Sequence, residues 1–366
     1  MAPHPRSRTV VCWTTRFSVV LVGLALVGEL VVRNFVHAPP ERSLDPDFGP
    51  GPRPHSLVIE SREGFARHRI DSAGRFDRSL STPVDRRVLL LGDSFSVGQQ
   101  VAHGERFSER VEEALEGVEV VNHAAPGWYP PYYTAWIRSH DVSRYDAVVI
   151  QLSEGDLFEL HRPDRVSVER EGDDGWELVM KGFPVRPSRL QQWSRWLSAR
   201  SALYDFTRQR IRLLAEQERS RLASRLGGSD ARAATVGASS RKVPEDAVDV
   251  LTALDHMARE HHDTIVYLYV PRPTYDRAGH VLEWPEARAA FQEFARRSGA
   301  VFVDPTDRIQ AAFERTGRPL HGFHNSVIGE GHLNSLGHRV VGDALADELA
   351  GILTSTEQPS SEAMKR

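Results

Sequence analysis

Five short, largely apolar runs, each closed by a proline, a glycine or a polar residue, constrain the fold of this chain more than any other feature. They lie at 88–91, 118–121, 146–152, 264–270 and 301–303. Runs of this kind are typical of strands buried on both faces of a sheet. Segments with helical periodicity separate or follow them, at 106–115, 130–139, 286–298, 306–316 and 336–352. This alternation predicts an α/β fold, a three-layer sandwich around a central, mostly parallel five-stranded sheet.

The spacing of the runs is interrupted once. More than a hundred residues separate the third run from the fourth, and most of the apolar residues there fall in a helix-rich stretch at 190–226. We interpret 157–262 as a helical insertion in a single domain at 57–353. A stiff linker rich in proline and glycine is expected at 38–56, and a polar, disordered tail at 354–366.

The first 37 residues are set apart by an apolar segment at 17–32, which follows several arginines and precedes Arg33. One interpretation is an uncleaved membrane anchor, with Glu29 in reach of Arg33 one helical turn later. The other is a secretory signal that is removed after Val36-His-Ala38. The basic residues favour a cytoplasmic N-terminus, so the body of the protein is expected outside the cytoplasm, either membrane-anchored or secreted.

Composition and motifs exclude several classes of protein. A formal net charge of −4 and a near-neutral pI of about 6.5 give no sign of a nucleic-acid partner. The single cysteine, Cys12, excludes an internal disulfide. His261-His262 and the pair His321 and His324 lack a metal-binding pattern, and neither a phosphate-binding loop nor a dinucleotide glycine motif is present. We therefore expect no metal and no cofactor.

The first three runs end in small polar loops: Gly92-Asp-Ser94, Ala125-Pro-Gly127 and Gly155-Asp156. Because parallel strands end at one edge of a sheet, these loops are expected to meet there. A serine nucleophile needs a base within hydrogen-bonding reach and a carboxylate that orients the base. Ser94, His332 and Glu330 supply these three residue types, and the backbone N–H groups of Ser94 and Gly127 are candidate donors to an oxyanion.

These blocks, in this order, resemble the SGNH (GDSL-type) hydrolases, in particular membrane-anchored bacterial members. The resemblance covers about 87–349 and is carried by Leu91-Gly-Asp-Ser-Phe-Ser-Val-Gly98, Val121-Asn-His-Ala-Ala-Pro-Gly127 and Glu330-Gly-His-Leu-Asn-Ser-Leu-Gly-His338. It implies a flavodoxin-like sheet, Ser94 as nucleophile, His332 as base and Gly127 as an oxyanion donor. Five further residues at the same loops are candidates for lining the substrate site: Asp93, Asn122, His123, Trp128 and Asp156.

Two departures from the family pattern matter for activity. Gly155 stands where the family has an asparagine whose side chain donates to the oxyanion, and losing one such donor typically costs about 100- to 1000-fold in rate. The carboxylate before the base is normally aspartate, whereas here it is Glu330.

Three functions follow from this pattern. The first is an esterase that removes O-acetyl or similar small acyl groups from a cell-envelope glycan or a related ester. The second is an O-acyltransferase that uses the same residues, and the third is a non-catalytic binding protein that keeps the fold.

Overall fold

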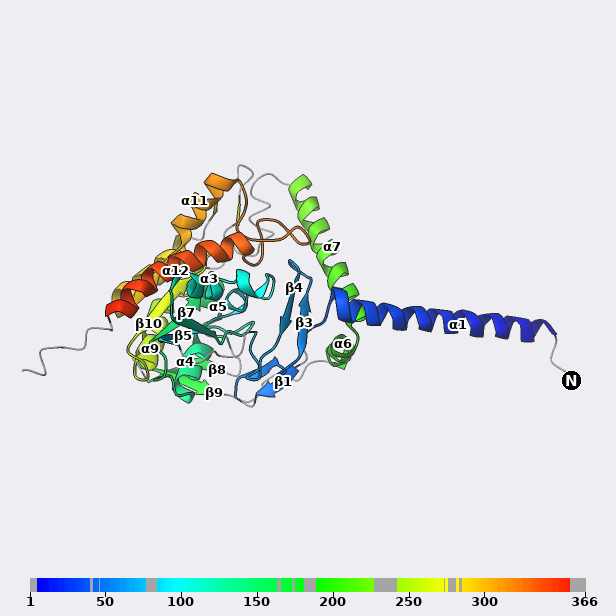
Figure 1. Ribbon diagram of the computed structural model, residues 1–366, viewed down its shortest axis with the longest axis horizontal. Helices are drawn as coiled ribbons and strands as arrows, with labels where there is room; N and C mark the ends of the chain where they lie inside the picture. Colours follow the sequence, from blue (N-terminus) through cyan, green and yellow to red (C-terminus); the bar gives the residue numbers. More distant parts are fainter. Residues whose placement is uncertain are drawn as a thin grey trace, which may run out of the picture.

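The structure is a computed structural model. It describes residues 5–39, 42–45, 47–76, 84–162, 166–172, 175–180, 189–226, 242–272, 274–275, 281–282 and 285–355. The sheet and the helices that cover it form one layered α/β body, and a long N-terminal helix projects from it (Figure 1).

The sheet has the predicted class and the predicted number of strands. Its strands lie in the order β13-β10-β7-β5-β6, and every neighbouring pair is parallel, which confirms the expected central five-stranded sheet. The strands are β5 (Arg86–Leu91), β6 (Val118–Asn122), β7 (Ala147–Leu152), β10 (Ile265–Tyr269) and β13 (Val301–Val303). Since β5 and β7 are both interior, the loops that follow them lie at the middle of one sheet edge.

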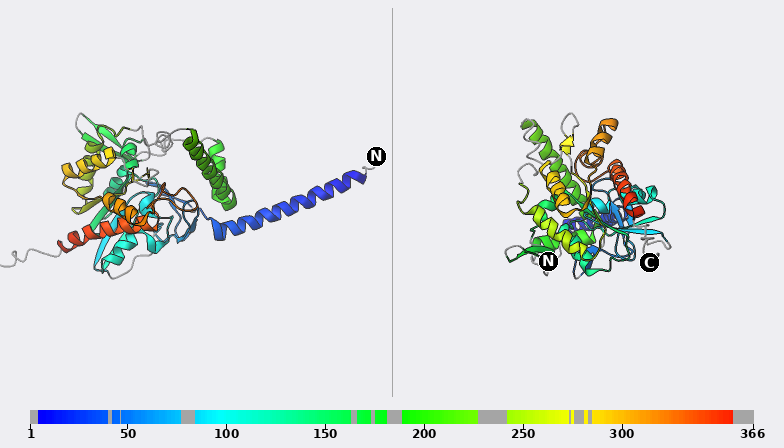
Figure 2. Two further views of the ribbon diagram at one scale, coloured as in Figure 1. Left: turned by 90° about the horizontal axis from the view of Figure 1, so that it is seen from above. Right: turned by 90° about the vertical axis from the view of Figure 1, so that its left-hand side faces the viewer.

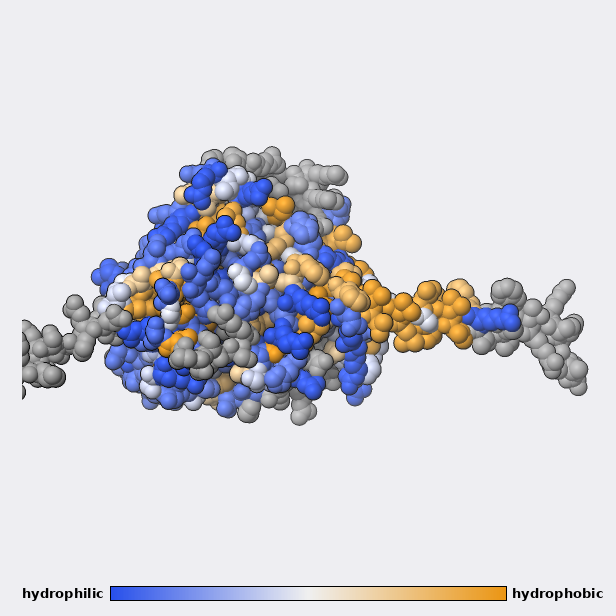
Figure 3. Space-filling view, viewed as in Figure 1, coloured by the Kyte–Doolittle hydropathy of each residue, from blue (hydrophilic) through white to orange (hydrophobic). Residues whose placement is uncertain are grey.

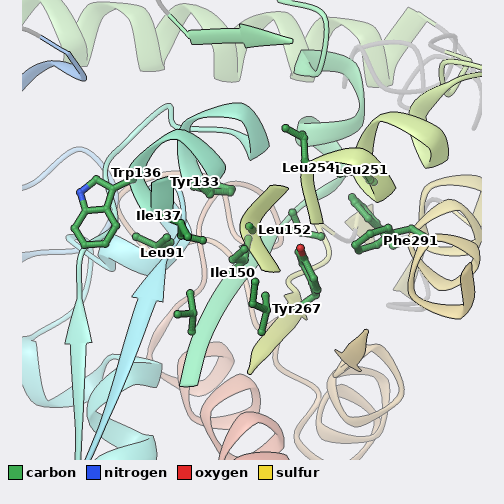
Figure 4. Packing of buried hydrophobic residues seen from close by; sticks show 14 of the residues in the cluster. Leu91, Tyr133, Trp136, Ile137, Ile150, Leu152, Leu251, Leu254, Tyr267 and Phe291 are labelled. Atoms are coloured by element: carbon green, nitrogen blue, oxygen red, sulfur yellow. The ribbon is translucent and has the colours of Figure 1, made fainter. Parts of the chain in front are cut away.

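Helices cover both faces of the sheet because successive side chains of a strand point to opposite sides. Leu89 and Leu91 of β5 pack on one face, and Val88 and Leu90 pack on the other. The first face is covered by α4 (Pro130–Ser139), α9 (Ala247–Arg259) and α10 (Pro285–Ser298), and Figure 4 shows its packing. The second face is covered by α3 (Phe107–Ala114), α11 (Thr306–Thr316) and α12 (Ser335–Ser355). Short helices α2 (Ser94–Val97), η2 (His103–Glu105) and α5 (Glu154–Glu159) begin at the strand ends or close to them.

The segment between β7 and β10 differs from the expected helical insertion. It contains the antiparallel hairpin of β8 (Val166–Glu171) and β9 (Gly175–Met180) as well as α6 (Arg189–Arg200) and α7 (Ala202–Leu226). Its last helix, α9, buries Val250, Leu251 and Leu254 against the sheet. This helix is therefore the crossover connection between parallel strands and belongs to the body, so the expected insertion boundary at 262 is too late.

The segment before β5 is more structured than a linker. It holds a hairpin of β1 (Arg42–Asp45) and β2 (Gly49–Pro52), and a second hairpin of β3 (Leu57–Glu60) and β4 (Ala66–Arg69). The second hairpin packs Val58 and Ile70 against Val97, just after the nucleophile loop. A further short pair, β11 (Thr274–Tyr275) and β12 (Val281–Leu282), follows β10. Of the expected tail, Thr354 and Ser355 belong to α12, and 356–366 lie outside the described residues.

The N-terminal helix α1 (Pro5–Val31) continues into a π-helical turn, η1 (Val32–Val36), and extends away from the body (Figure 2). By length and composition, one helix of the described chain is able to cross a membrane, at Arg16–Val36 with a mean hydropathy of 2.0. Its apolar side chains from Phe17 to Val31 are exposed (Figure 3). Glu29 accepts hydrogen bonds from Ser201 Oγ at 2.8 Å and from the backbone N–H groups of Ala202 and Leu203 at 2.9 and 3.0 Å, and so caps α7.

Candidate active site

Ser94 lies at the turn from the central strand β5 into α2. Asp93 caps this helix, since its Oδ1 accepts from the backbone N–H of Phe95 at 2.8 Å. Gln151, fully buried on the neighbouring strand, accepts from the Asp93 N–H and from Ser96 Oγ, both at 3.1 Å. A Cβ at Gly92 would lie 2.8 Å from Gln151 Oε1, so only glycine allows this close contact between the two strands. The turn thereby fixes the backbone at Ser94.

His332 lies in the loop that leads into α12. Asn334 begins this helix, because its Oδ1 accepts from the N–H groups of Leu336 and Gly337 at 3.1 and 3.2 Å while its Nδ2 donates to Pro319 O at 2.8 Å. The imidazole Nε2 of His332 lies 2.9 Å from Ser94 Oγ, a hydrogen bond in which the hydroxyl donates. The two residues that the sequence pairs as nucleophile and base are therefore in hydrogen-bonding contact.

The carboxylate on the other side of the imidazole is Glu63, and the expectation of Glu330 is wrong in this structure. His332 Nδ1 donates to Glu63 Oε2 at 2.5 Å, and the backbone N–H of His332 donates to the same oxygen at 3.3 Å. Glu330, two residues before the histidine, is exposed on the surface. The tight turn at Gly331, with φ +87°, directs the side chain of Glu330 away from the ring. Glu63 comes instead from the turn between β3 and β4.

Three features hold the Glu63 turn in place. Asn325 binds it reciprocally: its Oδ1 accepts from the Gly64 N–H at 2.8 Å, and its Nδ2 donates to the carbonyls of Gly64 and Ser61 at 2.7 and 3.2 Å. Gly331 makes room for the carboxylate, because a Cβ there would collide with Glu63 Oε1. Arg210 of α7 also donates to Ser61 O and, at 3.0 Å, to Asn325 O. The acid is therefore positioned by segments far apart in the sequence.

The charge state of Glu63 suits a partner of an imidazolium. Burial raises the pKa of its carboxyl, but the hydrogen bonds from His332 and the charge of that ring outweigh burial, so the pKa is lowered from its usual value. Glu63 is then ionised at neutral pH and fixes the His332 tautomer with its proton on Nδ1. Nε2 is left as an acceptor for the Ser94 proton.

The oxyanion side of the site is open. Gly127, the residue that ends the loop after β6, has φ +84°, is exposed and would leave a Cβ with no neighbour within 4 Å. Such a backbone lets a substrate approach the N–H closely. Gly155, in the first turn of α5 after β7, has no side chain to offer. A Cβ at 155 would meet Ser153 Oγ at 3.6 Å and the guanidinium Nη1 of Arg272 at 3.7 Å.

Two carboxyls that were candidates for lining the site are buried beneath it. Asp156 Oδ2 accepts from the Ser153 N–H at 2.6 Å and so caps α5. Burial raises the pKa of Asp156 well above its usual value, and the nearby charge of Asp93 raises it further. Burial also raises the pKa of Asp93. Both residues therefore act as structural caps of the helices that follow β5 and β7.

Of the remaining candidates, Asn122 and His123 have structural contacts, whereas Trp128 is partly open to solvent. Asn122 is buried and donates through Nδ2 to Ser96 O at 2.7 Å, which ties the ends of β5 and β6 together. The His123 ring packs 4.6 Å from Trp136, and burial lowers its pKa to about 3, so it stays neutral. Trp128 is half-buried and stacks on Tyr132 with ring centroids 5.9 Å apart. Of these three, Trp128 follows the open Gly127 directly.

The sequence contains no local signal for Glu63. It lies in a Ser-Arg-Glu-Gly turn before the first sheet strand, outside the blocks that carry the resemblance, and only the folded hairpin brings it to the histidine. Glu330 was expected as the orienting acid because it lies two residues before the base in sequence, at the position of the family's carboxylate. Arg272 was also missed, because it follows a strand end, that of β10, at which no small polar loop marks a site.

Comparison with known proteins gives only distant similarities. No model of a known protein family matches the chain, and no curated protein matches its sequence. Among solved structures, it is similar to a member of the lipolytic G-D-S-L family from Veillonella parvula, with 12% identity, a TM-score of 0.37 and coverage of 72% of this chain and 98% of that one. It is also similar to the esterase EstA from a Pseudoalteromonas species, with 12% identity, a TM-score of 0.38 and coverage of 74% and 100%. An acetyl xylan esterase matches with 12% identity, a TM-score of 0.40 and coverage of 72% and 99%.

Proposed function

We propose that this protein is a serine-dependent ester hydrolase in which Ser94 is the nucleophile, His332 the base and Glu63 the orienting acid. The observation that carries the proposal is the continuous hydrogen-bonded series from Ser94 Oγ through both imidazole nitrogens to the Glu63 carboxylate. A hydroxyl, an imidazole and an ionised carboxylate in this order form the arrangement that activates a serine. The alternative of a non-catalytic binding protein does not account for this hydrogen-bonded series.

The geometry supports a two-step reaction. Ser94 Oγ attacks the ester carbonyl carbon, its proton passes to His332 Nε2, and the carbonyl π electrons move onto oxygen. The tetrahedral species then expels the alcohol, which takes the proton from Nε2, and leaves Ser94 acylated. Water attacks the acyl-enzyme in the same way and releases the acid. Glu63 keeps its charge throughout and stabilises the imidazolium. We assign the backbone N–H groups of Ser94 and Gly127 as donors to the oxyanion.

The proposed substrate is an O-acetyl or similar small acyl ester on a cell-envelope glycan or a related alcohol. Two features of the site support this choice. Gly127 is exposed, so a bulky alcohol moiety is able to remain in solvent while its acyl group reaches Ser94. Trp128 presents a half-buried indole directly beside it, a surface on which a sugar ring is able to stack.

An active-site serine probe tests the proposal on the full chain in detergent. A fluorophosphonate should label the wild type at Ser94 and fail on Ser94→Ala, whose hydrolysis of p-nitrophenyl acetate should fall by about 10⁴-fold or more. Ser335→Ala, three residues beyond the base, is the matched control and should label normally. Equal labelling of wild type and Ser94→Ala contradicts the proposal. A parallel reaction with a glycan acceptor distinguishes transfer from hydrolysis, since transfer yields an acylated glycan.

We further propose that α1 anchors the protein in a membrane, with the hydrolase body outside the cytoplasm. The exposed apolar helix at Arg16–Val36 supports a span, and the hydrogen bonds of Glu29 to the start of α7 support an uncleaved one. Removal of residues 1–38 would take the cap of α7 away. The test is the N-terminal sequence of the membrane-bound protein after a carbonate wash. An N-terminus near Pro39, in a soluble fraction, would contradict the anchor.

A further inference from the structure

Arg272 reaches the active site from the end of the neighbouring strand. It follows β10, which pairs with β7, and the carboxyl ends of both strands lie at the edge where Ser94 sits. Glu154 holds its backbone: the Arg272 N–H donates to Oε1 and Oε2 of Glu154 at 2.8 and 2.9 Å. Tyr269 donates to the same carboxylate at 2.8 Å, and Glu154 itself is only 3% exposed. A buried, shared acceptor therefore fixes the point from which the arginine side chain extends.

The guanidinium lies between Gly155 and the nucleophile turn. Its Nη1 is 3.7 Å from the place of a Cβ at 155, on the side that an asparagine side chain would enter. Its Cζ is 5.1 Å from the ring centroid of Phe95, the residue after Ser94, a cation–π contact. The same Phe95 ring lies 5.3 Å from the ring of His332. The guanidinium, which comes from the end of β10, thus lies beside Gly155, the position that lacks a donor, and contacts the residue that follows Ser94.

The positive charge of Arg272 acts on the site. The residue is exposed, and its charge opposes the rise that burial causes in the pKa of Asp93, Glu154 and Asp156. A guanidinium cannot lose its proton in a protein, and it carries five N–H donors. Charge-assisted hydrogen bonds are roughly twice as strong as those between neutral groups.

We propose that the Arg272 guanidinium is the third oxyanion donor of this enzyme, in place of the side-chain amide that Gly155 cannot supply. The proposal rests on the proposed ester hydrolysis at Ser94. In the attack on the carbonyl, the oxygen that receives the π electrons accepts N–H bonds from Ser94, Gly127 and Arg272. Arg272 transfers no proton, and its charge balances the negative charge that develops. Glycine at 155 leaves the space beside the guanidinium open, and a side chain longer than a methyl group would compete with Arg272 for it.

A double replacement tests this assignment directly. Arg272→Ala should lower kcat for p-nitrophenyl acetate, a neutral ester, by about 100- to 1000-fold with little change in KM. Adding Gly155→Asn to that variant should restore at least about 10-fold, because the amide enters the vacated space. A Cβ at 155 makes only ordinary contacts, so the replacement fits. The matched control, Arg272→Ala with Gly155→Ala, should restore nothing.

The rate of fluorophosphonate labelling at Ser94 provides a second readout that needs no known substrate, since the phosphoryl oxygen of the probe uses the same donors. It should fall in Arg272→Ala and recover with Gly155→Asn. If wild type labels and Arg272→Ala labels and hydrolyses within a few-fold of it, the assignment is overturned while the hydrolase proposal stands. An effect confined to KM of anionic esters also overturns it, and makes Arg272 a substrate-charge anchor. Absence of labelling in wild type means that the hydrolase proposal itself has failed, and this assignment fails with it.

Discussion

The candidate site has two parts that are built differently. The nucleophile and the open glycine at 127 follow strand ends, and buried contacts such as those of Gln151 fix the nucleophile turn. The acid Glu63 lies in a half-buried hairpin turn, where a few hydrogen bonds from Asn325 and Arg210 hold it. Sheet packing therefore places the serine, whereas polar contacts between distant segments place its acid. The first part should tolerate changes nearby, and the second should respond to single substitutions.

The largest effect should come from the acid itself. Glu63→Gln removes the charge that stabilises the imidazolium and no longer fixes its tautomer, so kcat should fall by about 10³- to 10⁴-fold. Glu330→Gln is the matched control and should change kcat less than about 2-fold, because that side chain is exposed. The measurement is hydrolysis of p-nitrophenyl acetate by both variants. If Glu330→Gln is the more damaged of the two, the structural assignment of the acid is wrong.

A smaller effect should follow from loosening the turn without touching the acid. Asn325→Ala removes three hydrogen bonds to Ser61 and Gly64, and a displaced catalytic group loses rate steeply. We expect Asn325→Ala to lower kcat by about 10-fold in the wild type. The same substitution should cause no matching loss in the Glu63→Gln variant, where the acid no longer contributes. His324→Ala, an exposed neighbour, serves as the control and should keep full activity. Equal losses of kcat for Asn325→Ala in both backgrounds would show that Asn325 acts by a route other than Glu63.

The smallest effect concerns stability and pH. Burial raises the pKa of Glu63, but its bonds to His332 lower it overall, so the unfolded chain binds more protons than the folded protein between the two pKa values. Glu63 therefore stabilises the fold above its unfolded pKa of about 4.3, and this contribution is lost as the pH falls through the lower folded value. Urea unfolding of wild type and Glu63→Gln from pH 3 to 6 should show a difference of about 1 kcal/mol or less that disappears in acid. A difference that is constant with pH would contradict the pKa direction.

The same division explains how much was predictable from the sequence. The five strands and the positions of Ser94 and His332 follow from apolar runs and local motifs, because a parallel sheet brings its strand ends to one edge. Glu63 could not be predicted, since its contact with His332 depends on how the hairpin of β3 and β4, which precedes the nucleophile in sequence, packs on Val97. The role of Arg272 could not be predicted from the sequence either, because an arginine that follows a strand is compatible with many roles. The crossover helix α9 was assigned to the insertion because it follows a long segment after β7, and nothing in its sequence indicated that it packs against the sheet.

The bonds of Glu29 to the start of α7 have a consequence for where the enzyme is able to work. They connect the proposed membrane span directly to a helix whose Arg210 contacts the Glu63 turn, so a short path of described residues leads from the proposed span to the candidate acid. A long tether would let the enzyme search a wide volume of the envelope. With α1 as the proposed anchor, this connection would instead hold Ser94 at one height above the lipid surface. Only esters presented at that height would be within reach, so the anchor would select substrates by their distance from the membrane.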